Sequence, residues 1–186
     1  MAIYMWREAA PITIAWIYHS PEQWLISLSS DWTNWITIAD KNEWATTVWN
    51  GTDSISSSST FLWYPQEFNN IVAPTGYHIP SDVEFNNIIQ IWINMGAWSS
   101  WQWYIMTQLL RMPWLWYYRS GSWYQSQYRR FWTNVSESTN YGYRLNAWSS
   151  VLEVATENKN DRLLIRVIKD TPVQPDETRI VLYPTS

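Results

Sequence analysis

The chain of 186 residues contains no cysteine, only 5 glycines and few charged residues, which make up 15% of it. Without cysteine the chain has no disulfides, no thiolate metal sites and no cysteine nucleophile. No stretch reaches the roughly 18 apolar residues of a transmembrane helix, and the first residues lack the basic start of a signal peptide. The net charge is −4 and no basic stripe is present, so we expect neither nucleic-acid binding nor membrane insertion.

Aromatic residues, by contrast, are abundant. The chain has 17 tryptophans, and hydrophobic residues account for 46% of it. This composition and length predict one folded domain and not a disordered chain. An average glycine share of about 7% would give roughly 13 glycines in a chain of this length. The excess of tryptophan and the deficit of glycine therefore need an explanation.

Short runs of β-branched and aromatic residues, bounded by polar turn residues, predict strands along much of the chain. These strands are expected at 24–28, 35–39, 46–49, 61–64, 141–147, 151–155, 163–168 and 179–183. The region that follows Pro113 mixes aromatic residues, arginines and small polar residues, and the pattern predicts no regular structure for it.

The main helix is predicted from residue 81 to about residue 94. Ser81 and Glu84 have the spacing of a capping box, in which each side chain bonds the backbone of the other at the start of a helix. An apolar stripe with helical spacing follows, and it consists of Phe85, Ile88, Ile89 and Trp92. A shorter helix is predicted at 104–111, ended by Pro113.

Several short motifs occur in a fixed order along the chain. They are TIADKNEWATT at 37–47, PTGYHIPSDVEF at 74–85, an LxxP turn at 110–113, an aromatic-Trp-Thr-Asn segment at 131–134 and IRVIKD at 165–170. Together they resemble the Fibrobacter succinogenes major paralogous domain family. The resemblance implies an α+β, C-type-lectin-like fold, with antiparallel strands around one main helix and a long irregular region that faces the ligand. It implies a single domain at 24–186, with 1–23 as an N-terminal extension or the end of a preceding region.

The resemblance also divides the tryptophans into two groups. Trp35, Trp98 and Trp132 stand where the family itself has an aromatic residue. The second group stands where the family has glycine, and it consists of Trp24, Trp32, Trp44, Trp92 and Trp116. Glycine supplies a positive φ or room for a neighbouring backbone, and tryptophan supplies neither. A genetic code that reads UGA as glycine would explain this, and a truly tryptophan-rich binding domain is the alternative. The codons at these positions decide between the two.

Catalytic constellations are missing from the sequence. His19 and His78 lack the spacing of a metal site, and His78 is expected to be a structural turn residue. Glu84 is better explained by helix capping than by acid–base chemistry. The segments at 174–176 and 132–134 resemble two lectin calcium motifs, but their order is reversed. Formylglycine-generating enzymes use a related fold, but their activity depends on cysteine. We therefore expect no enzyme activity, no cofactor and no metal site.

The region from residue 98 to residue 129 is the predicted ligand-facing surface. Its tyrosine, tryptophan and arginine side chains give a large contact area at low entropic cost. The candidate ligand-binding residues are Trp98, Tyr117, Tyr118, Arg119, Tyr124, Gln125, Tyr128 and Arg129. The sequence thus predicts a non-enzymatic, extracellular or cell-surface domain that binds an unidentified glycan or protein. A structural or adhesion repeat of a larger surface protein is one alternative, and a receptor-binding protein diversified by a retroelement is another.

Overall fold

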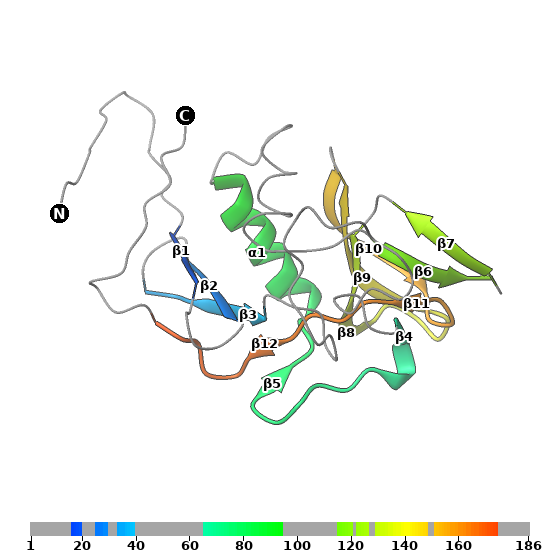
Figure 1. Cartoon of the computed structure of the whole chain (residues 1–186), viewed down its shortest axis with the longest axis horizontal. Helices are drawn as coiled ribbons and strands as arrows, with labels where there is room; N and C mark the ends of the chain where they lie inside the picture. The colour runs from blue at the N-terminus through cyan, green and yellow to red at the C-terminus, as the bar shows by residue number, and fades with distance from the viewer. Residues whose placement is uncertain are drawn as a thin grey trace.

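The computed structural model describes residues 16–19, 25–29, 33–39, 65–94, 115–120, 122–126, 129–148 and 151–174. These residues form three sheets with antiparallel strand pairing and one α-helix (Figure 1). The predictions at 46–49, 61–64, 104–111 and 179–183 lie outside the described residues.

The first sheet joins early strands of the chain to a late one, in the order β1-β2-β3-β12-β5. Its strands are β1 (Trp16–His19), β2 (Leu25–Ser29), β3 (Ile36–Ala39), β12 (Ile168–Lys169) and β5 (Tyr77–His78). The strands predicted at 24–28 and 35–39 are confirmed as β2 and β3. β1 comes from the segment expected to be an extension, and it pairs with β2 along its whole length.

The other two sheets are built mainly from the second half of the chain. One has the order β10-β9-β8, with β8 (Arg129–Ser136), β9 (Tyr141–Trp148) and β10 (Val151–Asn158). The other has the order β4-β11-β6-β7, with β4 (Gln66–Glu67), β11 (Arg162–Leu163), β6 (Leu115–Arg119) and β7 (Ser122–Ser126). A short 3-10 helix, η1 (Phe68–Asn70), follows β4. The strands predicted at 141–147 and 151–155 are confirmed as β9 and β10.

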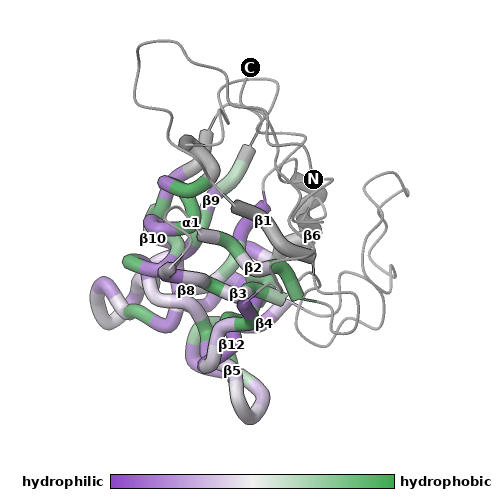
Figure 2. Tube along the Cα trace, turned by 90° about the vertical axis from the view of Figure 1, so that its left-hand side faces the viewer, coloured by the Kyte–Doolittle hydropathy of each residue, from purple (hydrophilic) through white to green (hydrophobic). Residues whose placement is uncertain are grey.

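Helix α1 (Asp82–Asn94) confirms the predicted main helix, and it packs against β2 on one side and against β8, β9 and β10 on the other (Figure 1). The capping box is present: the Ser81 hydroxyl accepts a hydrogen bond from the Glu84 backbone at 3.2 Å. The stripe residues Phe85, Ile88 and Ile89 are buried. In Figure 2 hydrophobic stretches (green) surround α1, while hydrophilic stretches (purple) occupy outer turns.

The expected α+β fold with a long irregular ligand-facing region is wrong. The described residues are mostly antiparallel β-structure with one α-helix. Part of the region expected to be irregular forms the β6–β7 hairpin, in which Arg119 pairs with Ser122. Ser120 has a φ of 50°, in the left-handed region that two-residue hairpin loops require. The aromatic residues on both sides of this turn favour strand structure, which explains the difference.

The prediction of one continuous strand at 163–168 is also wrong. This buried segment instead connects all three sheets. Its first residue, Leu163, belongs to β11. Leu164 then bonds the backbone of β8: its N–H donates to the Arg130 carbonyl at 3.3 Å, and its carbonyl accepts from the Trp132 N–H at 3.0 Å. Ile168 lies in β12 and pairs with both β3 and β5. The apolar character of the segment reflects its burial between sheets and not membership of one ladder.

The two tryptophan groups differ where the structure describes them. Trp35 and Trp132 are buried, as expected for residues that belong to the fold, and Trp132 donates from Nε1 to the Gln66 carbonyl at 2.7 Å. Trp92 lies in α1, and Trp116 lies in β6 opposite Gln125. Helix and strand are backbone conformations that any residue adopts, so these two positions require no positive φ. The remaining positions are outside the described residues, and they are Trp24, Trp32, Trp44 and Trp98.

Candidate functional site

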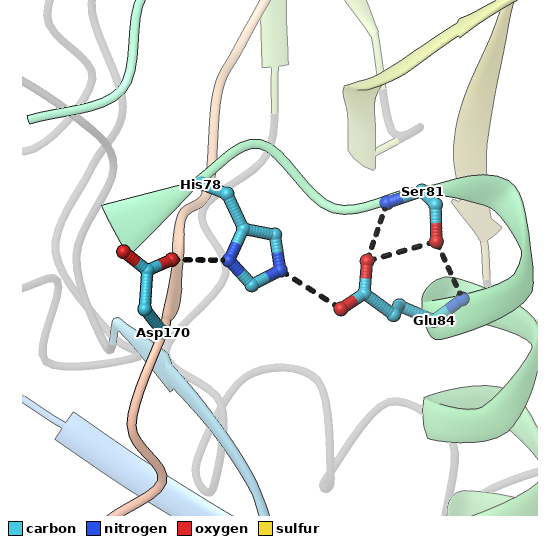
Figure 3. A network of polar contacts seen from close by, with 4 residues as sticks. All are labelled: His78, Ser81, Glu84 and Asp170. Carbon is cyan, nitrogen blue, oxygen red and sulfur yellow. Dashed lines mark hydrogen bonds and ion pairs between the residues drawn. The ribbon is translucent and has the colours of Figure 1, made fainter. Parts of the chain in front are cut away.

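Two of the sequence motifs, at 74–85 and 165–170, meet in one polar network around His78 (Figure 3). The His78 ring in β5 lies between Asp170, which follows β12, and Glu84 in the first turn of α1. Its Nδ1 is 2.7 Å from Asp170 Oδ1, and its Nε2 is 2.8 Å from Glu84 Oε1. The other oxygen of Glu84 accepts hydrogen bonds from the Ser81 backbone N–H and hydroxyl, both at 2.8 Å. The network thus connects β5, β12 and α1.

The charges of this network favour a protonated histidine. Burial lowers the pKa of His78, but the hydrogen bonds to Asp170 and Glu84 outweigh this effect and raise the pKa above its ordinary value. Burial likewise raises the pKa of Glu84, but hydrogen bonds from Ser81 and His78 outweigh it and lower the pKa. Because both ring nitrogens are bonded to carboxylates, neither is available as a general base. The arrangement links three structural elements, and His78 lies in strand β5 and not in the turn expected from the sequence.

We expect His78→Gln to destabilise the domain more at pH 5.5 than at pH 8.5. The raised pKa of His78 means that its contribution is complete below the ordinary value of 6.5 and is lost as the pH rises through the folded-state value. The loss at pH 5.5 should be up to about 1 kcal/mol, because the groups are partly exposed. Urea unfolding of both proteins at the two pH values measures this. An equal loss at both values would show that the imidazole charge does not contribute.

A second set of charged side chains is buried on one face of the β8–β9–β10 sheet. Glu157 Oε2 accepts hydrogen bonds from Arg130 Nη1 at 2.9 Å and from Arg144 Nε at 3.1 Å. Strand register places Asn146 opposite both Arg130 and Glu153, and Asn146 Nδ2 donates to Glu153 Oε1 at 3.0 Å. All these residues except Glu153 are buried. These residues occupy alternate positions along their strands, so their side chains lie on the same face of the sheet.

Asp161 connects these buried charges to the β6–β7 hairpin. It lies just before β11 and is 4% exposed, and its Oδ2 is 3.8 Å from the Nε of Arg119 at the end of β6. Burial and the nearby Glu157 carboxylate raise the pKa of Asp161 to about 6. We call Arg130, Arg144, Asn146, Glu157 and Asp161 the Glu157 cluster.

Buried atoms of the Glu157 cluster without a hydrogen-bond partner among the described residues include Nη1 of Arg144, Oδ1 of Asn146 and Oδ2 of Asp161. A buried polar atom without a partner costs about 1–3 kcal/mol, and such atoms are few in folded proteins. The Glu157 cluster therefore contains buried polar groups whose hydrogen bonding the described residues do not complete.

Of the predicted ligand-binding residues, Tyr118 and Arg119 lie together beside β11. The guanidinium of Arg162 is 5.0 Å from the centre of the Tyr118 ring, and it also bonds Glu67 Oε1 from Nε and Nη2 at 3.1 and 3.0 Å. The Arg119 side chain is 52% exposed. We call Tyr118, Arg119, Asp161 and Arg162 the β6–β11 edge.

The other predicted residues do not join this edge in the described part of the chain. Arg129 begins β8 and is only 1% exposed, so its side chain belongs to the interior. Tyr117 pairs with Tyr124 through the backbone of the β6–β7 hairpin, where Gln125 also lies. The side chains of these three residues, and the whole of Trp98 and Tyr128, lie outside the described atoms.

Sequence reasoning missed four residues of this site, because their importance depends on partners far along the chain. These are Arg144, Asn146, Glu157 and Asp161. A signal was present: polar residues alternate at 144 and 146, and carboxylates stand at 153, on the neighbouring predicted strand, and at 157, just after it. Opposite charges on paired strands stabilise each other, so this pattern indicates one polar face across two strands.

Comparisons with protein families, with curated proteins and with solved structures find no match to this chain. The family resemblance therefore stays a prediction. In the described residues, no set of three or more histidine and acidic side chains is arranged to hold a metal ion. The helix in this part of the chain is too short to span a membrane, and no other described helix has the length and apolar character to do so.

Proposed function

We propose that this chain is a non-enzymatic, extracellular or cell-surface binding domain, whose glycan or protein ligand contacts the β6–β11 edge. The observation that carries this proposal is the position of Arg119. Its half-exposed guanidinium lies 3.8 Å from the carboxylate of Asp161, which is almost completely buried. An exposed arginine held beside a buried acid can offer hydrogen bonds to a ligand while its charge stays balanced.

Two further features of the β6–β11 edge support ligand binding. Tyr118 provides a ring of partly exposed apolar surface, and Arg162 lies over it at 5.0 Å while bonded to Glu67. Tyrosine and arginine supply much of the binding energy in protein recognition sites. Because Arg162 is fixed by two hydrogen bonds to one carboxylate oxygen, little of its freedom remains to be lost on binding.

Arg119→Ala should weaken ligand retention at least tenfold, because truncation of a central arginine in an interface commonly costs about 2 kcal/mol. Retention is measured on an oligosaccharide array and on a panel of immobilised extracellular proteins. Lys169→Ala is the control, since Lys169 is a partly buried cation of β12 in another sheet and packs over Tyr77. Retention that is equal in wild type and Arg119→Ala would contradict the proposal, as would the absence of retention by every probe.

A further inference from the structure

We infer that Asp161 is a positioning residue that holds the turn of the β6–β7 hairpin, so that mild acid releases Arg119 and weakens ligand retention at the β6–β11 edge. This inference rests on the proposed function, and it adds regulation by pH to that same site. Its basis is geometric: the exposed arginine at the end of β6 lies against one buried carboxylate from a distant part of the chain.

Two groups of the hairpin turn contact Asp161. The Nε of Arg119 lies 3.8 Å from Asp161 Oδ2, and the backbone N–H of Ser120 lies near enough to the carboxylate to stabilise its charge. Ser120 has a φ of 50°, which is uncommon for a residue other than glycine. A residue keeps such a conformation where its surroundings hold it, and the Asp161 carboxylate is part of those surroundings.

On its inner side Asp161 faces the charges of the β8–β9–β10 sheet. The Glu157 carboxylate of β10 lies close to it and favours its neutral form, while Arg119 favours its ionised form. Arg130 of β8 and Arg144 of β9 both donate to Glu157 Oε2. The ionised Asp161 is therefore balanced from the hairpin side, by Arg119, and is opposed from the sheet side, by Glu157.

The other charged groups near β11 make contacts of their own. Arg162, the residue after Asp161, donates from Nε and Nη2 to Glu67 Oε1 in β4. Lys159 Nζ donates to the turn that follows β8. Arg129 begins β8 and alternates with the residue that bonds Glu157, so its side chain starts from the other face of the strand. Arginine and lysine keep their charge between pH 5 and pH 8, so a change of charge in this set arises from its carboxylates.

The charge of Asp161 changes under mildly acidic conditions. Its pKa is raised to about 6, chiefly by burial and then by the charge of Glu157. At higher pH the ionised carboxylate attracts Arg119 and the Ser120 N–H. At lower pH the neutral carboxyl group has no charge to offer Arg119, and it can donate its proton in a hydrogen bond to Glu157. Protonation thus shifts the bonding of Asp161 from the hairpin turn to the sheet and leaves Arg119 unrestrained.

Acid unfolding does not account for a loss of retention at pH 5. The pKa of Asp161 and the pKa of His78 are both raised, so the folded state binds these two protons more tightly than the unfolded chain does. Each of the two groups therefore adds stability as the pH falls from 8 to 5. The lowered pKa of Glu84 has the opposite effect, but only below its ordinary value of 4.5. The domain should thus stay folded at pH 5 while Arg119 is less well held.

The first test uses the protein alone. Two-dimensional NMR follows the backbone amide resonance of Ser120 between pH 4.5 and pH 8 in wild type, Asp161→Asn and His78→Gln. We expect a step with a midpoint at about pH 6 in wild type, because the charge beside this N–H disappears there. The step should be absent in Asp161→Asn and unchanged in His78→Gln. A Ser120 resonance that does not titrate in wild type, or that titrates equally in Asp161→Asn, would overturn the inference.

The second test measures retention of the oligosaccharide or immobilised protein that wild type retains best at pH 7.5. At pH 5 about nine-tenths of Asp161 is protonated, so retention should fall about fivefold. Asp161→Asn, which is always neutral, should retain the same probe about tenfold less than wild type at pH 7.5 and change little at pH 5. His78→Gln should keep the wild-type fall. Near-ultraviolet circular dichroism at both pH values shows that each protein is folded.

The outcomes separate this inference from the proposed function. Retention that is lost in Arg119→Ala but is equal at pH 5 and pH 7.5 would overturn the inference and leave the binding function standing. A fall at pH 5 that persists in Asp161→Asn would assign the effect to another group and would also overturn the inference. No retention by any probe at either pH would overturn the proposed function and the regulation together, whatever the NMR titration shows.

Discussion

Glu157→Gln should lower the free energy of unfolding by about 3–5 kcal/mol at pH 7, because it leaves two buried guanidinium groups without their counter-charge. Glu157 Oε2 accepts hydrogen bonds from both Arg130 and Arg144. Each of the three side chains is at most 10% exposed, so water replaces little of the lost interaction. Burial and the neighbouring charge of Arg130 lower the pKa of Arg144, and the charge and hydrogen bond of Glu157 oppose this effect.

Urea unfolding followed by tryptophan fluorescence measures this loss. Glu153→Gln is the matched control, because Glu153 is an exposed carboxylate on the same strand and the same face of the sheet. It should cost less than about 1 kcal/mol, as is usual for exposed polar interactions. If Glu157→Gln proved as mild as its control, the Arg130 and Arg144 charges would have to be compensated by other groups.

Local signals in the sequence predicted the elements that depend on neighbouring residues. The capping box at Ser81 and Glu84 and the apolar stripe after it located α1, because a helix start is defined within one turn. Alternating residues located β9 and β10. Such local signals do not describe the segment at 163–168. Its residues have strand character, but their backbone hydrogen-bond partners lie in three different sheets. No local pattern specifies such pairing.

The candidate site was predictable only in part, for the same reason. Residue type selected both Arg119 and Arg129 as candidates for ligand binding, but Arg119 is exposed and Arg129 is buried. What distinguishes Arg119 from Arg129 is the sheet to which each strand belongs, and that is a tertiary property. No local pattern indicates that Asp161 lies beside Arg119, because the two residues are far apart in the sequence.

The motifs that carry the family resemblance have a structural explanation in the His78 network. His78 and Glu84 belong to the motif at 74–85 and Asp170 to the distant motif at 165–170, yet one imidazole bonds both carboxylates. These residues hold β5, α1 and β12 together, so the sequence motifs that contain them reflect the architecture of the domain. The residues proposed to contact ligand lie elsewhere, on the β6–β11 edge. A shared motif of this kind would therefore indicate a shared scaffold and leave the ligand open.

Asp161→Asn should stabilise the domain at pH 8 and at the same time weaken ligand retention about tenfold, because Arg119 loses the carboxylate beside it. The pKa of Asp161 is raised from 3.8 to about 6, chiefly by burial. A carboxyl group that binds its proton more tightly in the folded state costs stability as the pH rises from 3.8 through about 6. The full cost corresponds to roughly 3 kcal/mol, and a neutral amide of the same shape avoids it. At pH 4 the two proteins should be nearly equal in stability.

Urea unfolding at pH 4 and pH 8, together with the oligosaccharide array, tests both halves of this prediction. Asp170→Asn is the control, because its carboxylate bonds His78 and the same substitution there should destabilise. Loss of stability in Asp161→Asn at pH 8 would show that the Arg119 ion pair outweighs the cost of burying the charge. A gain in stability with a loss of retention would mean that Asp161 is kept for binding at the expense of folding. Ionisable groups held at such a cost are typical of functional sites.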